Sequence, residues 1–141
     1  MKNTKRQTDN AKGGKRLKRH ELPVPSEEDE QATLFRWAEW NTCTFPELKL
    51  MFHVPNEGKR SIQRGAMMRR IGLKAGVPDI CLPVPRGIWH GMFIEMKRQK
   101  GGTLGDSQRE WIEALTKQGY YCIVARGWEV AAKEIQEYLQ I

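Results

Sequence analysis

Two short stretches, Gly76-Val77-Pro78-Asp79 and Gly91-Met92-Phe93-Ile94-Glu95-Met96-Lys97, decide how this chain is expected to fold. The second stretch is apolar until it reaches Glu95. Side chains two positions apart in a β-strand point to the same face of the sheet. Glu95 and Lys97 are therefore predicted to project side by side, with Met96 turned away into a core.

The residues between these stretches predict a β-hairpin. Asp79 opens the apolar run 80–84, and Pro85-Arg86-Gly87 can turn the chain back into residues 88–97. Such a hairpin brings two carboxylates and one amine together at one end of a sheet. Two carboxylates and one amine are the smallest set of groups that could hold a divalent cation against a phosphodiester.

The rest of the chain alternates between helical and strand patterns. Helices are predicted at about 27–41, 60–71, 106–119 and 127–140, and further strands at 48–54 and 120–125. Asp106 or Ser107 is expected to cap the third helix. The order of elements predicts an α/β fold, a sheet layered with helices.

The net charge of +7 comes from one end of the chain. Residues 1–20 carry eight Lys or Arg against the single acid Asp9, and the remaining residues carry sixteen charges of each sign. Residues 1–25 are predicted to be a disordered basic tail, and residues 26–141 to be one folded domain. The tail could bind phosphates through counterion release, or it could be an incidental solubilising extension.

Composition also narrows the location of the protein. Apolar runs fall well short of the roughly 18 residues that a membrane span needs, and the N-terminus lacks the apolar stretch of a signal peptide. The three cysteines (Cys43, Cys81 and Cys122) have no CxxC spacing and are expected to be reduced thiols. A cytoplasmic protein without membrane contact is predicted.

A basic segment precedes Asp79. Residues 49–74 hold seven Lys or Arg against Glu57 alone. Such a surface next to the proposed site suits a nucleic-acid substrate, although many basic stretches are only solvated helix faces. The basic residues expected to contact DNA are Lys59, Arg60, Arg64, Arg70 and Lys74.

The apolar faces of two predicted helices begin with polar residues. Extending the face of the first helix backwards reaches Gln31 and then Glu27, and extending that of the third reaches Gln108. Buried polar groups are costly unless they are paired. Either these faces emerge into solvent, or both helices direct these residues at a shared polar centre on the sheet.

These residues would suit metal-assisted hydrolysis of a phosphodiester. Asp79 and Glu95 offer hard oxygen ligands for Mg²⁺, and the backbone carbonyl of Met96 could supply a third. Lys97 would orient the attacking water or stabilise the developing charge, and Glu27 could add a second metal or a water contact. The ordinary alternative is an ion pair on a half-exposed strand, because a Glu-x-Lys sequence is common by chance.

Five motifs in this order resemble VRR-NUC domains, a branch of the PD-(D/E)xK nuclease superfamily. They are Glu27-xxx-Gln31, His53-Val54-Pro55-Asn56, Gly76-Val77-Pro78-Asp79, Glu95-Met96-Lys97 and Gln108-Arg109-Glu110-Trp111. The resemblance covers roughly residues 26–140. It is closest to the stand-alone form of the domain in phages and bacteria.

The resemblance implies a mixed four-stranded sheet flanked by helices and a DNA nuclease that uses Mg²⁺ or Mn²⁺. It implies metal ligands at Asp79 and Glu95, a catalytic lysine at Lys97, and supporting roles for Glu27 and Gln108. Glu28 and Glu30 are close to Glu27, but the spacing to Gln31 favours Glu27. His53 and Asn56 match a loop motif near the site, and His53 could equally be structural.

Stand-alone members of the family resemble dimeric Holliday-junction resolvases, so a homodimer acting on branched DNA is expected. The rival from another class is a non-catalytic nucleic-acid-binding protein, in which Lys97→Ala would change nothing measurable. A sequence-reading restriction nuclease is a third possibility, but the chain has little room for a separate recognition domain.

Overall fold

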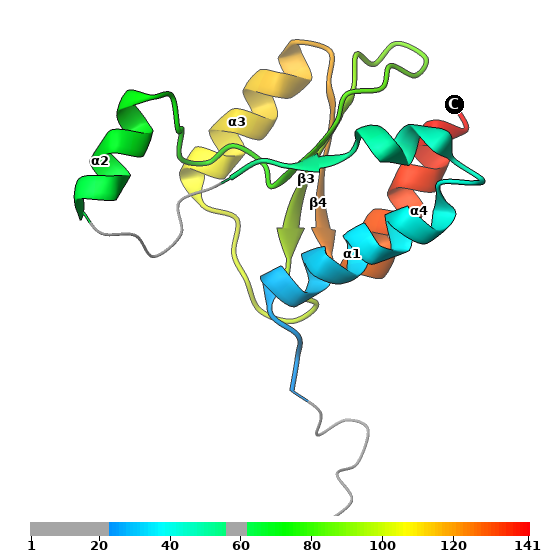
Figure 1. Cartoon of the computed structure of the whole chain (residues 1–141). Coiled ribbons are helices and arrows are strands. Elements are labelled where there is room, and N and C mark those ends of the chain that lie inside the picture. Colours follow the sequence, from blue (N-terminus) through cyan, green and yellow to red (C-terminus); the bar gives the residue numbers. More distant parts are fainter. Residues whose placement is uncertain (1–22, 56–61) are drawn as a thin grey trace, which may run out of the picture.

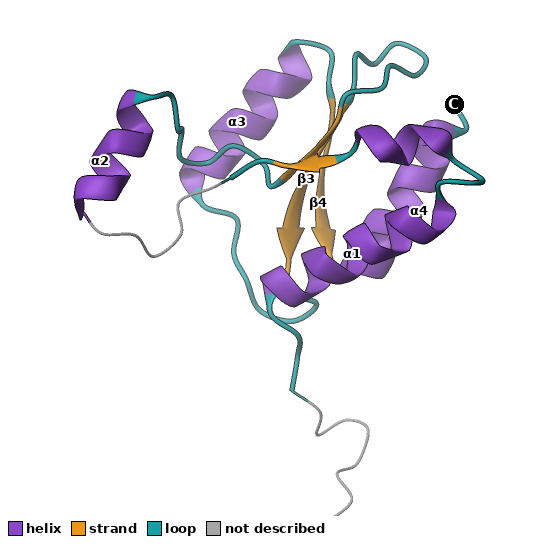
Figure 2. Ribbon diagram, in the orientation of Figure 1, coloured by secondary structure: helices purple, strands orange, loops and turns teal. Residues whose placement is uncertain are grey.

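A mixed four-stranded sheet forms the centre of the protein (Figures 1 and 2). The structure is a computed structural model that describes residues 23–55 and 62–141. The strands are β1 (Phe52–His53), β2 (Ile80–Leu82), β3 (Met92–Lys97) and β4 (Tyr121–Arg126), in the spatial order β1-β2-β3-β4. β1, β2 and β3 pair antiparallel, whereas β3 and β4 pair parallel. The predicted α/β class and mixed sheet are confirmed.

Helices cover the sheet unequally. They are α1 (Glu27–Asn41), α2 (Ile62–Arg70), α3 (Asp106–Lys117) and α4 (Trp128–Leu139). α1 and α4 pack together on one face, α3 lies against the other, and α2 stands apart from the sheet (Figure 1). The main core lies between the sheet and the α1–α4 pair, where Leu34, Ile94 and Ile135 are fully buried.

Local chemistry explains why α1 begins where the sequence predicted. The Ser26 hydroxyl accepts a hydrogen bond from the Asp29 amide at 3.1 Å, and the Asp29 carboxylate accepts one from the Ser26 amide at 3.2 Å. This capping box satisfies two backbone donors that a helix N-terminus leaves without partners.

The strand prediction for residues 48–54 is largely wrong. Pro46–Leu50 forms a 3-10 helix, and only Phe52 and His53 join the sheet. Proline at the first position of this turn favours helical backbone angles, and the buried Leu48 anchors it to the core. The apolar pattern of this segment therefore marks a buried turn followed by a very short edge strand.

The other predicted elements differ only at their ends. The hairpin forms as predicted, with its turn at Arg86–Trp89. The cap of α3 is Gly105 instead of Asp106 or Ser107, and its amide donates to the Gln108 side chain at 2.9 Å. Residues 60 and 61 of the predicted second helix, and most of the predicted basic tail, lie outside the described residues.

Candidate active site

Asp79 and Glu95 face each other across the β2–β3 ladder. Ile80 pairs with Ile94, so the next antiparallel position places Asp79 opposite Glu95. Residues opposite each other in such a ladder put their side chains on the same face. The Asp79 carboxylate also accepts a hydrogen bond from the Met96 amide at 2.9 Å. The hairpin register thus fixes both carboxylates at the carboxyl end of β3.

Lys97 joins this pair from the same strand. Its Nζ donates to Glu95 Oε1 at 2.8 Å and lies 3.9 Å from Glu27 Oε1. Glu95 and Lys97 are only 1% and 5% exposed, while Met96 between them packs in the core on the opposite face. A buried ion pair is weak evidence for stability because removing two charges from water costs free energy. Burial here points instead to a functional group held in place.

The electrostatics of Glu95 are unusual for a glutamate. Burial raises its pKa from the ordinary 4.5 to about 7; the Lys97 hydrogen bond opposes this rise, and the Asp79 and Glu27 carboxylates add to it. Oε1 accepts from both Lys97 and the Gln108 amide. Oε2 is buried and has no hydrogen-bond partner in the described part of the chain. A buried acceptor of this kind is what a bound cation would satisfy.

Two helices deliver polar side chains to this cluster from opposite faces of the sheet. Glu27 comes from the first turn of α1, and Gln108 comes from the first turn of α3. The Gln108 amide nitrogen donates to Glu95 Oε1. Gln31, by contrast, lies beside His53. The shared polar centre that the helical patterns indicated therefore includes Glu27 and Gln108 directly, and Gln31 through His53.

His53 contacts the main chain of Asp79. Its Nδ1 lies 2.9 Å from the Asp79 carbonyl oxygen and 2.9 Å from Gln31 Nε2. The amide of Val54 donates to the same carbonyl at 2.8 Å. With a proton on Nδ1 the ring donates to this carbonyl, and in the other tautomer Nδ1 accepts from the Gln31 amide nitrogen. These contacts fit a residue that positions Asp79 better than one that takes part in chemistry.

Two glycines allow the close approaches that the cluster needs. Gly76 has φ +85°, and a Cβ at this position would lie 2.7 Å from the Ser107 backbone. This contact seats the start of α3, and hence Gln108, against the Asp79 segment. Gly102 has φ +75°, and a Cβ there would lie 3.1 Å from Glu27 Oε1. The loop between β3 and α3 therefore passes directly over the cluster.

Sequence reasoning did not single out the buried acid of α1. Glu30 is 1% exposed, and its Oε2 accepts from the Trp128 amide at the start of α4 at 2.8 Å. The neighbouring Gly127 amide donates to the Lys97 carbonyl at 3.0 Å. Glu30 thus joins α1 to α4 next to the end of β3. Its spacing of four from the buried Leu34 was the signal that could have found it.

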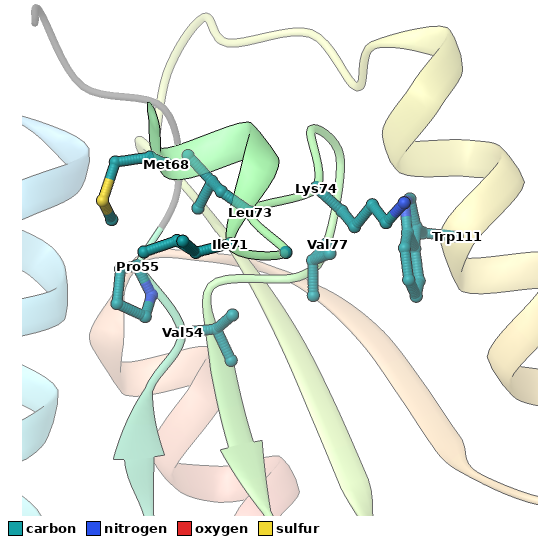
Figure 3. A pocket seen from close by; sticks show the side chains of 9 residues that line it. Val54, Pro55, Met68, Ile71, Leu73, Lys74, Val77 and Trp111 are labelled. Carbon is teal, nitrogen blue, oxygen red and sulfur yellow. The ribbon is translucent and has the colours of Figure 1, made fainter. Parts of the chain in front are cut away.

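The residues predicted to bind DNA are dispersed. Asn56, Lys59 and Arg60 lie outside the described residues. Arg64 and Arg70 are exposed on α2, the helix that stands apart from the sheet (Figure 1). Lys74 follows α2 and lines a pocket together with Trp111 (Figure 3). The structure therefore does not gather these residues into the carboxylate cluster itself.

The donor set of the cluster fits a hard divalent cation. Mg²⁺ commonly binds through one or two carboxylates and keeps several waters. Asp79 and Glu95 supply two such carboxylates, and Glu95 Oε2 is one of two buried acceptors, with Glu30 Oε1, that have no hydrogen-bond partner among residues 23–55 and 62–141. The same described residues contain no group of three or more His, Cys, Asp or Glu arranged to hold a metal. A bound ion would therefore rely on water for much of its coordination.

A mixed sheet with an acid before β2 and an acid and a lysine on β3 defines a nuclease-like α/β protein. Comparisons with known proteins agree. The VRR-NUC domain matches residues 26–129. A solved structure described as a VRR_NUC domain protein is 30% identical, with a TM-score of 0.72, and the match covers 84% of this chain and 91% of that chain. A search of curated proteins found no match. The chain belongs to the VRR-NUC family of nucleases.

Proposed function

We propose that this protein is a metal-dependent, structure-selective endodeoxyribonuclease that hydrolyses phosphodiesters in branched DNA such as Holliday junctions. The observation that carries the proposal is the buried Glu95 Oε2, which faces no hydrogen-bond donor in the described part of the chain. It lies in a cluster with Asp79 and Lys97. A bound cation would give this oxygen the partner it lacks, and the Asp79 carboxylate across the ladder would supply a second ligand.

Mg²⁺ or Mn²⁺ is the proposed cofactor. Asp79, Glu95 and the Met96 carbonyl would hold the ion, and Glu27 would add a water-mediated or direct contact. When bound, such an ion neutralises phosphate charge and lowers the pKa of a coordinated water. The raised pKa of Glu95, about 7, means that binding the ion requires this carboxyl to lose its proton near neutral pH.

Lys97 and Gln108 have distinct roles in this proposal. The Lys97 ammonium is held by Glu95 at 2.8 Å and lies near Glu27. In this position it would stabilise the negative charge that develops on the oxygens of the scissile phosphate. Gln108 binds the same Glu95 oxygen that Lys97 binds. Together they engage Oε1 and leave Oε2 available, which orients the glutamate before substrate arrives.

Assembly and location are proposed by family resemblance. Stand-alone members of the family resemble dimeric Holliday-junction resolvases, and two sites related by a twofold axis would suit paired incisions across a four-way junction. Residues 26–141 would form the nuclease domain and residues 1–25 a basic tail. A cytoplasmic location is also proposed. Helices of a length and apolarity that could cross a membrane are absent from the described residues.

The test is cleavage of a four-way junction, a flap and a linear duplex with Mg²⁺, Mn²⁺ or EDTA. Asp79→Ala and Lys97→Ala should abolish cleavage. Lys133→Ala is a matched control, because Lys133 is exposed on α4 and pairs with Glu137. Cleavage that survives EDTA, or either site substitution, would defeat the metal-dependent mechanism. Cleavage confined to linear DNA would defeat the junction assignment.

The same experiment separates the non-catalytic alternative. A protein that only binds nucleic acid would show no cleavage with any ion, and Lys97→Ala would leave its DNA affinity unchanged. The buried Glu95 carboxylate has a raised pKa and one oxygen without a hydrogen-bond partner in the described part of the chain. These features favour the nuclease over the non-catalytic binding protein.

A further inference from the structure

An apolar pocket of about 400 Å³ lies between α2 and α3 (Figure 3). Its walls come from the end of β1, from α2 and the turn after it, and from α3. Val54, Ile71, Val77 and Trp111 supply much of the apolar lining, and Lys74 stands at its edge. This volume is within the roughly 300–1,000 Å³ range of small-molecule sites.

The pocket shares its backbone segments with the proposed active site. Trp111 is one helical turn beyond Gln108, whose side chain binds Glu95. Val77 is two residues before Asp79, and the Val54 amide donates to the Asp79 carbonyl at 2.8 Å. A helical turn advances about 5.4 Å, so the pocket begins close to where a scissile phosphate would bind.

The lining chemistry suits a nucleobase joined to a phosphate backbone. Trp111 offers an aromatic surface, and the Lys74 side chain extends toward it in Figure 3. Residues 62–78 contain four Lys or Arg and no acid. Stacking on an aromatic ring tolerates any base, and nearby cations attract the phosphates on either side.

We propose that this pocket, the base pocket, accepts one unpaired nucleobase from the strand whose phosphodiester lies at Asp79 and Glu95. This inference rests on the proposed nuclease function. It explains how the proposed active site would select branched DNA. A base beside a branch point lacks a continuous stack on one side and, in a flap, is already single-stranded, so it enters at lower cost. A base in a continuous duplex must first be unpaired and unstacked.

A second copy of the chain is the other conceivable occupant of this apolar surface. In a twofold interface, each patch meets its own copy. The basic segment 62–78 would then face an identical basic segment, and like charges repel. Charge complementarity therefore favours DNA.

The experiment is an abasic-site scan read by fluorescence anisotropy. A four-way junction carries one abasic position at a time around the mapped cut, and binding is measured in EDTA, so that cleavage is prevented. One position near the cut should weaken wild-type binding by roughly 5- to 100-fold, the range expected for losing one stacked base. Trp111→Leu should weaken binding to intact DNA similarly and should abolish the further effect of that abasic position.

Two further variants separate stacking from folding. Trp111→Phe keeps an aromatic ring and should keep most of the affinity and the abasic profile. Trp40→Leu is the matched control, because Trp40 is 77% exposed at the far end of α1, and it should leave the profile unchanged. Thermal melting, monitored by circular dichroism, verifies that each variant folds.

The outcomes distinguish the base pocket from the nuclease function. A Trp111→Leu protein that cleaves junctions and keeps the wild-type abasic profile would overturn the base pocket alone. If Trp111→Leu kept the wild-type abasic profile but changed its oligomeric state in sedimentation, the pocket would be a contact between two copies of the chain. That result would also overturn the base pocket. A wild-type protein that neither binds nor cleaves any DNA would overturn both proposals.

Discussion

The two faces of β3 have opposite character. On the α1–α4 face, Met92, Ile94 and Met96 are at most 1% exposed and belong to the main core. On the α3 face, Phe93 is half-buried, and Glu95 and Lys97 are buried charges. Every residue of α3 remains at least partly exposed, although its sequence is strongly amphipathic. One strand thus divides the two tasks: its even-numbered residues pack the core, and two of its odd-numbered residues, Glu95 and Lys97, are the ones proposed to carry the chemistry.

The largest expected effect lies on the chemical face. Glu95→Gln should lower the rate of junction cleavage by roughly 10³-fold or more, because the neutral amide cannot supply the anionic ligand. The variant should still fold, since its amide oxygen can accept from Lys97 as Glu95 Oε1 does. Cleavage kinetics in Mg²⁺, with a thermal melt for folding, measure both. A variant that cleaves at the wild-type rate would remove Glu95 from the mechanism.

The core face should respond in the opposite way. Ile94→Ala leaves a cavity beside fully buried residues and should lower the free energy of unfolding by about 2–5 kcal/mol. Below its melting temperature, the folded variant should cleave at close to the wild-type rate. Urea unfolding gives the stability, and a cleavage assay at low temperature gives the rate. Loss of cleavage in a fully folded variant would show that the two faces are not separable.

The pH dependence of stability isolates the buried carboxyl. Because the folded pKa of Glu95 is about 7 and the ordinary value is 4.5, the folded protein binds more protons between these values. The metal-free protein should therefore lose stability as pH rises from about 4.5 to 7, by at most roughly 3 kcal/mol. Urea unfolding across this range in EDTA measures the loss. Glu95→Gln should flatten this contribution; an unchanged slope would assign it to another group.

The smallest expected effects distinguish two acids on the same helix. Glu30→Ala removes the acceptor for the Trp128 amide and should destabilise the fold by about 1–2 kcal/mol, with cleavage by the folded protein retained. Glu27→Gln should leave stability within about 0.5 kcal/mol and should reduce cleavage, because Glu27 approaches Lys97 and is partly exposed. Urea unfolding and cleavage assays on both variants measure the contrast. The reverse pattern would exchange their roles.

Much of this arrangement was predictable from the sequence, because local patterns and short-range pairing dominate it. The period-two pattern at Glu95 and Lys97 and the short connection to Asp79 fix the hairpin. The α/β class followed from apolar spacing and element order, and the mixed four-stranded sheet followed from the family resemblance. The strand prediction for residues 48–54 was wrong because a 3-10 turn that begins with proline and buries a leucine can have the same apolar composition as a strand.

The remainder depends on long-range contacts that a sequence pattern does not encode. Glu30 accepts from Trp128, 98 positions away. His53 reaches the Asp79 carbonyl, 26 positions away. The pairing of Gln108 with the same oxygen as Lys97 also depends on how α3 is seated, which Gly76 permits by its close approach to Ser107. Such contacts appear only when separate elements are packed together.

The most direct test of the central claim is the rate of junction cleavage as Mn²⁺ concentration is varied, for wild type and Asp79→Asn at pH 8. At this pH most of the Glu95 carboxyl, whose pKa is about 7, is deprotonated without metal, so the rate reports ion binding with less competition from protons. For wild type, the cleavage rate should rise with Mn²⁺ concentration and saturate. Asp79→Asn should show negligible cleavage at every concentration. Cleavage by wild type without metal, or equal saturation curves for the two proteins, would contradict it.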